Sequence, residues 1–394
     1  MQREHANVLL LACCQALLQT GGVTLIAITG LAGYALAGDK AFATVPLTSY
    51  VFGSAFTTIP ASLLMKRAGR RRGFMAGTSI GMLGAALCSL AIYRSSFWLL
   101  CAGMMVMGAY TAFGKYYRFA AADAAEDGFK AKAISFTLAG GIVGGVVGPE
   151  MAKLTRTTFP LHDFLGSYLS LIGVCLIASL LLLRLNIPQL SERDQRESGR
   201  ALAEIMRQPT FIVAALAAML SYGIMNLLMT STPLAMRAHD HHFNAAALVL
   251  EWHVIAMYGP SFFTGSLINR FGVLNVILAG IALICGCIAV ALAGTELMNF
   301  WIALVLLGVG WNFMFIGGSA LLTECHTPAE RAKTQAANDF MVFGTMAVSS
   351  MSSGVLLNRS GWQAVNYGSL PFLLLAAGAT FWLMSQRRAA NQQA

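Results

Sequence analysis

The chain of 394 residues is 57% hydrophobic and only 11% charged, with a mean hydropathy of +0.66. Soluble globular chains carry about a quarter charged residues, so this composition excludes a largely water-exposed surface. The formal net charge of +9 comes from Lys and Arg residues between apolar runs, such as Arg70-Arg71-Arg72. This placement indicates charge at a membrane face and excludes a nucleic-acid partner.

Apolar runs long enough to cross a bilayer, about 20 residues each, follow one another along the chain. They predict helices, because an open strand leaves its backbone groups unpaired in lipid. In chain order, the predicted spans are 7–30, 41–64, 73–93, 97–120, 133–152, 166–186, 209–232, 246–268, 272–293, 299–322, 335–357 and 366–385. The predicted fold class is therefore an all-α membrane protein with twelve transmembrane helices.

One long polar segment, 187–208, divides the chain nearly in half. It predicts a cytoplasmic linker between an N-terminal six-helix bundle, 1–186, and a C-terminal six-helix bundle, 209–394. With both termini in the cytoplasm, 20 of the 26 Lys and Arg residues lie on the inner side, as the positive-inside rule requires. We expect a multi-pass protein of the bacterial inner membrane in this orientation.

The two predicted halves resemble each other in sequence. The segment SLLMKRAG at 62–69, after the second span, corresponds to GSLINRFG at 265–272, after the eighth, at an offset of 203 residues. Phe97-Trp98 opens the fourth span and Phe300-Trp301 opens the tenth at the same offset. An internal repeat of this kind is typical of carriers that work by alternating access.

On these segments the chain resembles the major facilitator superfamily over its whole length. That family carries a G-x-x-x-D-R-x-G-R-R-like loop after the second and eighth spans. The residues of this loop motif that are kept here are Arg67, Gly69, Arg70, Gly265, Arg270 and Gly272. Ser62, Lys66 and Asn269 depart from the pattern. The resemblance implies two pseudo-symmetric halves that rock about a central site, in a monomer within the lipid bilayer.

Met225 and Met229 on the seventh span, and His253 and Met257 on the eighth, are each spaced i, i+4. This spacing places each pair on one helix face. Thioethers with an imidazole suit a soft ion such as Cu(I), whereas methionine is also a common packing residue. The pattern is similar to that of CcoA-type copper importers, a branch of the same superfamily. The resemblance implies copper import with these four residues as transient ligands, copper being the transported substrate and no cofactor being needed.

The outer loop after the seventh span carries further metal-binding groups, namely Met236, His239, His241 and His242. Such a loop near the outer end of the pathway suits the collection of a metal ion. A solvated polar loop is the alternative interpretation.

A second polar set suits a flat organic substrate, because aromatic and amide groups stack on and hydrogen-bond ring systems. Its members are Gln15, Gln19, Tyr117, Trp311, Asn312 and Asn338. In the family that the chain resembles, the first, fourth, seventh and tenth spans line the central cavity. The copper-importer branch also includes riboflavin transporters, so riboflavin uptake is the alternative function.

Two further predictions concern drug efflux and the driving ion. The fifth span carries Gly144-Gly-Val-Val-Gly148-Pro149, similar to a motif of drug antiporters, which leaves proton-coupled drug efflux as a third reading. Acids within spans are candidates for proton coupling, and the best placed are Glu251, Asp339 and Asp123. We expect no enzyme, because the sequence contains no P-loop, nucleotide fingerprint or HExxH motif.

Overall fold

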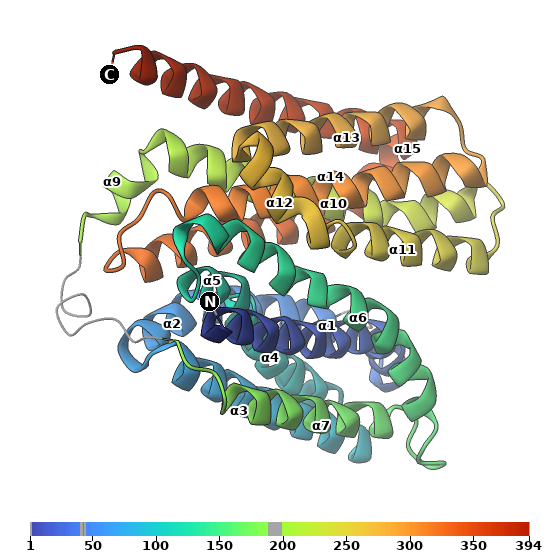
Figure 1. Cartoon of the computed structure of the whole chain (residues 1–394). Coiled ribbons are helices and arrows are strands. Elements are labelled where there is room, and N and C mark those ends of the chain that lie inside the picture. The colour runs from blue at the N-terminus through green and yellow to red at the C-terminus, as the bar shows by residue number, and fades with distance from the viewer. Residues whose placement is uncertain (1, 40–41, 43–44, 188–198, 394) are drawn as a thin grey trace. The chain divides into compact units, whose positions relative to one another are not determined.

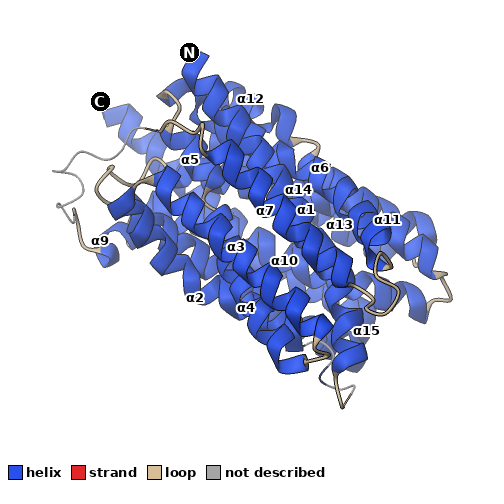
Figure 2. Cartoon of the chain, turned by 90° about the horizontal axis from the view of Figure 1, so that it is seen from below, coloured by secondary structure: helices blue, strands red, loops and turns tan. Residues whose placement is uncertain are grey.

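The computed structural model describes residues 2–39, 42, 45–187 and 199–393 (Figure 1). These residues are helical almost throughout, and no strand forms among them (Figure 2). The chain forms two compact units: unit 1 contains Met1–Ala125 and Phe136–Glu197, and unit 2 contains Glu126–Ser135 and Ser198–Ala394. The predicted division at 187–208 stays a prediction, and residues 188–198 of that linker lie outside the described residues.

The helices of unit 1 are α1 (Gln2–Leu36), α2 (Val45–Ala68), α3 (Arg70–Tyr93), α4 (Phe97–Gly114), α5 (Tyr117–Asp123), α6 (Lys130–Arg156) and α7 (Leu165–Leu182). Helix α6 begins within unit 2 and continues in unit 1. Helix α4 packs on α2 and α3, and α3 also packs on α7. The fourth predicted span therefore consists of α4 and the short α5.

The helices of unit 2 are α9 (Leu202–Met206), α10 (Pro209–Ala238), α11 (Phe243–Tyr258), α12 (Ser261–Phe271), α13 (Val273–Ala293), α14 (Leu297–Leu322) and α15 (Arg331–Gln393). Helix α14 packs against α10, α11 and α13, and α10 also packs along α15. The eighth predicted span is broken into α11 and α12. Conversely, α15 joins the last two predicted spans across a non-helical Gly361.

Nine helices in the described part of the chain are long and apolar enough to cross a membrane. The other predicted spans are helical as well, but each departs from a uniform apolar run. Helix α2 is rich in hydroxyl groups and contains Pro60, the eighth span is interrupted at Gly259-Pro260, and α15 begins with a polar stretch. The predicted all-α membrane fold is confirmed. The described residues of all twelve predicted spans are largely helical, and residues 41, 43 and 44 of the second span lie outside the described residues.

The loop motif after the second and eighth spans turns the chain at equivalent glycines. Gly69 begins α3 with φ of 86°, and Gly272 begins α13 with the same φ. Side chains rarely adopt this left-handed backbone, so only glycine makes the turn without strain. The two turns are 203 residues apart, so the backbone repeats the internal symmetry seen in the sequence.

The glycine-rich part of α6 packs tightly against α1. A Cβ atom at Gly144 would lie 2.5 Å from Cβ of Gln19, and one at Gly148 would lie 2.8 Å from Cβ of Val23. The hydroxyl of Thr24 also donates a hydrogen bond to the Gly148 carbonyl at 2.9 Å. Close helix packing in a membrane favours glycine at the contact. Packing therefore accounts for these glycines without a role in drug efflux.

Candidate functional site

The four candidate copper ligands lie within unit 2. Met225 and Met229 are on α10, the first buried and the second half-buried, while His253 and Met257 are buried on α11. Helix α11 packs mainly on α14. The i, i+4 spacing within each pair is preserved by the helices, and metal binding by the four residues together stays a prediction.

The two ring nitrogens of His253 differ in their hydrogen bonding. Its Nδ1 lies 2.7 Å from the carbonyl oxygen of Leu304 on α14 and donates a proton to it. The ring is completely buried, and Nε2 has no hydrogen-bond partner in the described structure. Because Nδ1 carries the proton, Nε2 presents a lone pair, which is the form of histidine that ligates metals.

The histidines after α10 are engaged in structural contacts. Nδ1 of His239 lies 2.8 Å from the carbonyl oxygen of Ala235, and Nε2 of His241 lies 2.8 Å from that of Thr295. The His241 ring also packs edge-on against Phe300, with the centroids 5.7 Å apart. His242 precedes the first residue of α11, and Met236 is buried. Among the described residues, no group of three or more His, Cys, Asp or Glu side chains is arranged to hold a metal ion.

Four aromatic rings from three helices meet in unit 2, and we call them the aromatic cluster: Tyr222, Tyr258, Trp311 and Phe315. Trp311 and Phe315 stack one helical turn apart on α14, with ring centroids 5.0 Å apart. Tyr222 of α10 packs edge-on against both rings, at 5.2 and 5.0 Å. Tyr258, at the end of α11, packs edge-on against Trp311 at 5.8 Å.

The indole of Trp311 carries a hydrogen-bond donor for which the described residues offer no acceptor. Only 1% of Trp311 is exposed, and its Nε1 has no hydrogen-bond partner among the residues described. A buried N–H group without an acceptor costs about 1–3 kcal/mol. A buried donor without an acceptor needs an explanation, and a ligand that supplies the acceptor is one.

The other residues proposed for an organic substrate lie in different environments. Tyr117 is buried and packs on Phe74 of α3, with centroids 4.7 Å apart. On α1, Gln15 is buried and Gln19 is half-buried. Asn338 is buried on α15 and donates a hydrogen bond to its neighbour Asp339 at 2.9 Å. Substrate contact by these four residues stays a prediction.

Asn312 is fully buried, and its amide is committed to other residues of unit 2. It donates through Nδ2 to the Met257 carbonyl and to the Ser261 hydroxyl, both at 2.6 Å, and it accepts from Thr264 at 2.7 Å. An amide bonded in this way has little capacity left for a ligand. We therefore do not include Asn312 among the residues proposed to touch substrate.

The three candidate proton-coupling acids differ in burial and in their contacts. Glu251 is exposed on α11, whereas Asp339 is buried on α15. Asp123 forms a buried ion pair with Arg70 of the loop motif, with Nη2 and Oδ2 2.8 Å apart. A structural ion pair therefore accounts for Asp123, and proton coupling through Glu251 or Asp339 stays a prediction.

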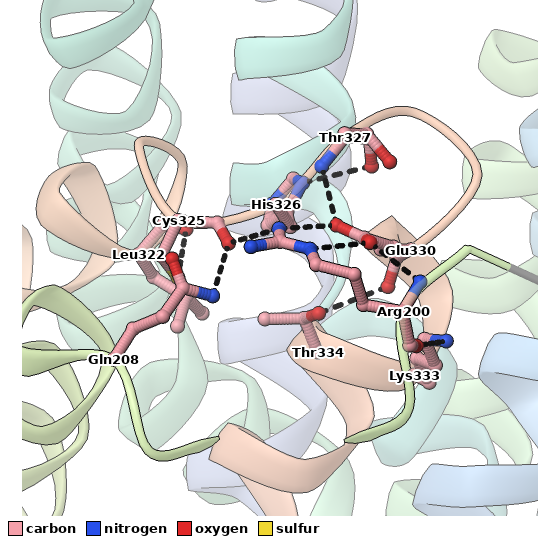
Figure 3. Close-up of polar contacts among 9 residues, drawn as sticks. All are labelled: Arg200, Gln208, Leu322, Cys325, His326, Thr327, Glu330, Lys333 and Thr334. Carbon is pink, nitrogen blue, oxygen red and sulfur yellow. Dashed lines mark hydrogen bonds and ion pairs between the residues drawn. The ribbon is translucent and has the colours of Figure 1, made fainter. Parts of the chain in front are cut away.

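A polar cluster at the start of α15 was not predicted from the sequence (Figure 3). The buried carboxylate of Glu330 accepts hydrogen bonds from Nε and Nη2 of Arg200, at 2.8 and 2.6 Å, and from the Arg200 backbone N–H at 2.8 Å. The backbone N–H of Thr327 donates to the same carboxylate at 3.0 Å. These bonds, with the charge of Arg200, hold the pKa of Glu330 well below its usual range.

Part of this polar cluster could have been recognised from a short sequence pattern. Thr327-Pro-Ala-Glu330 directly precedes α15, and Ser/Thr-x-x-Glu is the pattern of a helix capping box. Arg200, by contrast, comes from the end of the predicted linker, 130 residues away. Its pairing with Glu330 depends on the folded structure of unit 2.

We expect Glu330→Gln to lower the free energy of unfolding by about 2 kcal/mol at neutral pH, because hydrogen bonds to a charged group contribute about 1.5–3 kcal/mol each. The folded-state pKa of Glu330 is lowered, so this stabilisation is complete above the ordinary Glu pKa of about 4.3. It is lost as the pH falls towards the folded-state value. Unfolding of the purified wild type and variant at several pH values measures both effects.

Glu324→Gln is the matched control for this prediction. Glu324 belongs to the same loop, but its ion pair with Arg387 is exposed, and exposed pairs contribute about 0–1 kcal/mol. Equal losses of stability in the two variants would contradict a special role for the Glu330 cluster.

Comparison with known proteins agrees with this architecture. The sequence model of the Major Facilitator Superfamily matches residues 9–259 and 215–394. The chain is 41% identical over 371 residues to the riboflavin transporter RfnT of Brucella anthropi, covering 94% of this chain and 93% of that one. It is 32% identical to the uncharacterized transporter YdeG of Bacillus subtilis (strain 168), covering 89% of this chain and 86% of that one.

Solved structures show the same fold at much lower sequence identity. The transporter FucP in its outward conformation matches with a TM-score of 0.76 and 16% identity, covering 95% of this chain and 98% of that one. The family match spans both halves of the chain and the relatives are transporters, so the expectation of a membrane transporter and not an enzyme is confirmed. The chain therefore belongs to the Major Facilitator Superfamily.

Proposed function

We propose that this transporter takes up riboflavin, or a closely related flavin, across the inner membrane of a bacterium. The observation that carries the proposal is the aromatic cluster with the unused indole N–H of Trp311. The similarity to the riboflavin transporter RfnT supports the same substrate class. Riboflavin, the alternative in our sequence interpretation, thus replaces copper as the preferred substrate.

The chemistry of the aromatic cluster matches that of a flavin. The isoalloxazine ring is flat, offers a π-face for stacking on aromatic side chains, and has carbonyl oxygens at its edge. Stacking on Trp311 or Tyr222 supplies apolar contact, and aromatic pairs add about 0.5–1.5 kcal/mol beyond the area that they bury. A flavin carbonyl oxygen would accept a hydrogen bond from Nε1 of Trp311, for which no described residue supplies an acceptor.

Copper import is the second candidate, and one observation favours it. Nε2 of His253 is buried and unoccupied, with its lone pair available, and the thioethers of Met225, Met229 and Met257 are ligands that suit Cu(I). However, the bond from Nδ1 to the Leu304 carbonyl also gives His253 a structural role, since it ties α11 to α14. We therefore rank copper below riboflavin.

In the proposed cycle the two halves rock about the substrate site and expose it alternately to the two sides of the membrane. The transporter works as a monomer with both termini in the cytoplasm, which is the orientation that the distribution of Lys and Arg favours. Glu251 and Asp339 are the proposed proton-coupling acids.

The test is uptake of radiolabelled riboflavin and of radioactive copper, side by side, into cells that carry or lack the transporter. We expect riboflavin to accumulate only in cells that carry it, with no difference in copper. Accumulation of copper alone would overturn the proposal and assign the pathway to the Met and His residues. The control is the Trp311→Ala variant, whose presence in the membrane is verified by immunoblot.

A further inference from the structure

The eighth membrane span is interrupted in its middle. Helix α11 ends at Tyr258 and α12 begins at Ser261, with Gly259 and Pro260 between them. Proline has no backbone N–H and breaks the ladder of helical hydrogen bonds, so such a break in a membrane needs polar groups from neighbouring helices. Gly259 and Pro260 both keep right-handed helical backbone angles, so the break lies in the hydrogen-bond ladder, and a ladder left open at this point lets the span bend.

The side chain of Asn312 spans this break from α14. Its Nδ2 donates to the Met257 carbonyl of α11 and to the Ser261 hydroxyl of α12, both at 2.6 Å. Its Oδ1 accepts from the Thr264 hydroxyl of α12 at 2.7 Å. One amide thus holds both sides of the break, and all three polar side chains are completely buried.

These bonds are adjacent in sequence to the aromatic cluster. Asn312 follows Trp311, and Met257 precedes Tyr258. Trp311 and Tyr258 are the two rings that meet edge-on at 5.8 Å. The hydrogen bond from Asn312 to the Met257 carbonyl therefore fixes the register of α11 against α14 at the level where the rings meet.

A second hydrogen bond holds α11 against α14, two helical turns from Asn312. His253 donates to the Leu304 carbonyl, two turns before Asn312 on α14. At Gly308, between those two levels, a Cβ atom would lie 2.8 Å from the carbonyl oxygen of His253. Helices α11 and α14 therefore touch closely along this stretch, and polar bonds lie above and below the contact.

We propose that Asn312 is a positioning residue for substrate binding: its amide locks the break between α11 and α12 and holds Tyr258 against Trp311 in the geometry that receives the flavin ring. The eighth span then moves with α14 as one body and does not bend at Gly259-Pro260 during transport. The part of this inference that concerns the flavin rests on the proposed function, whereas the locking of the break does not.

The test compares Asn312→Leu with Asn275→Leu, the same change at an exposed asparagine of α13 whose amide donates to the Phe271 carbonyl at the end of α12. In Asn312→Leu we expect faster hydrogen exchange of the backbone at 256–265 and a KM for riboflavin about tenfold higher, with a maximal rate within about twofold of the wild type. Asn275→Leu should leave all three quantities unchanged. Thr264→Val removes the hydroxyl that lies within hydrogen-bond distance of both the Asn312 amide oxygen and the Pro260 carbonyl. We expect it to give an intermediate result, because the two bonds donated by the Asn312 amide remain, and it serves as the test variant should Asn312→Leu fail to fold.

A double-mutant cycle separates positioning from a general loss of structure. In a Tyr258→Ala background, Asn312→Leu should produce no further rise in KM, because the ring that it positions has been removed. An undiminished effect in that background, or unchanged hydrogen exchange at 256–265, would overturn the positioning role. Should the wild type fail to transport riboflavin, the proposed function falls, while the exchange measurement still decides whether Asn312 locks the break.

Discussion

Replacing Trp311 with alanine is expected to raise the KM for riboflavin about 100-fold, the largest effect on transport that the structure predicts. The change removes both the stacking surface and the unused indole N–H of the aromatic cluster. Losing aromatic stacking and one buried hydrogen bond together corresponds to about 2–3 kcal/mol. Initial rates of labelled riboflavin uptake at several concentrations, normalised to the amount of transporter in the membrane, measure the change.

Two variants make this result specific. Trp311→Phe keeps a ring but lacks the N–H, so the KM should rise only about tenfold, the value of one hydrogen bond of about 1.4 kcal/mol. Trp98→Ala removes a tryptophan that is 75% exposed at the start of α4 and should transport normally. A normal KM for riboflavin in Trp311→Ala would show that the aromatic cluster does not bind the substrate.

Replacing Gly108 with valine is expected to cause a large loss of stability. A Cβ atom at Gly108 on α4 would lie 2.0 Å from the carbonyl oxygen of Tyr50 on α2, and 2.9 Å from the backbone nitrogen of Ser54. Two backbones in contact cannot yield as a flexible side chain does, so the helices must separate. Overpacking typically costs about 1–3 kcal/mol, and we expect at least ~3 kcal/mol here because the obstacle is backbone.

The yield and the thermal unfolding temperature of the purified protein measure this effect. Gly173→Val on α7 is the matched control, because a Cβ atom at Gly173 would meet nothing within 4 Å. The control should remain within about 0.5 kcal/mol of the wild type. A Gly108→Val protein as stable as the control would mean that α2 and α4 do not approach as closely as the structure has them.

Because of the internal repeat, the close contact of Gly108 with α2 has a counterpart in unit 2. Gly308 on α14 is 200 residues after Gly108, and a Cβ atom there would lie 2.8 Å from the His253 carbonyl of α11. The glycine therefore permits close approach of the second and fourth helices in each half. The wider gap at Gly308 predicts a smaller loss of stability for Gly308→Val than for Gly108→Val.

The sequence by itself determined the helical membrane fold. Long apolar runs have few conformations available in lipid, because each backbone group must be bonded within its own helix. For this reason even the spans with unusual composition, such as α2 with its hydroxyl groups, were placed correctly. The sequence also identified Gly69 and Gly272 as residues of the loop motif, and the structure shows that both adopt the positive φ that glycine favours.

Only the tertiary structure decided which buried polar groups are hydrogen-bonded to other residues and which are left available to a ligand. Trp311 and Asn312 are neighbours in sequence, and both were predicted to contact an organic substrate. In the described part of the fold the indole N–H of Trp311 has no hydrogen-bond partner, whereas the Asn312 amide has three. Hydrogen bonding of a buried side chain depends on atoms from other helices, and spacing along one helix does not contain that information.

The same reason explains why Tyr222, Tyr258 and Phe315 were not predicted. Each is an ordinary aromatic residue of an apolar helix, and only the packing of α10 and α11 on α14 brings their rings to Trp311. The i, i+4 spacing of His253 and Met257 is preserved on α11. The hydrogen bond from His253 Nδ1 to the Leu304 carbonyl, however, depends on the packing of α11 against α14. The sequence thus determines where the helices form. Whether a buried polar side chain binds a ligand or bonds to another helix depends on how the helices pack.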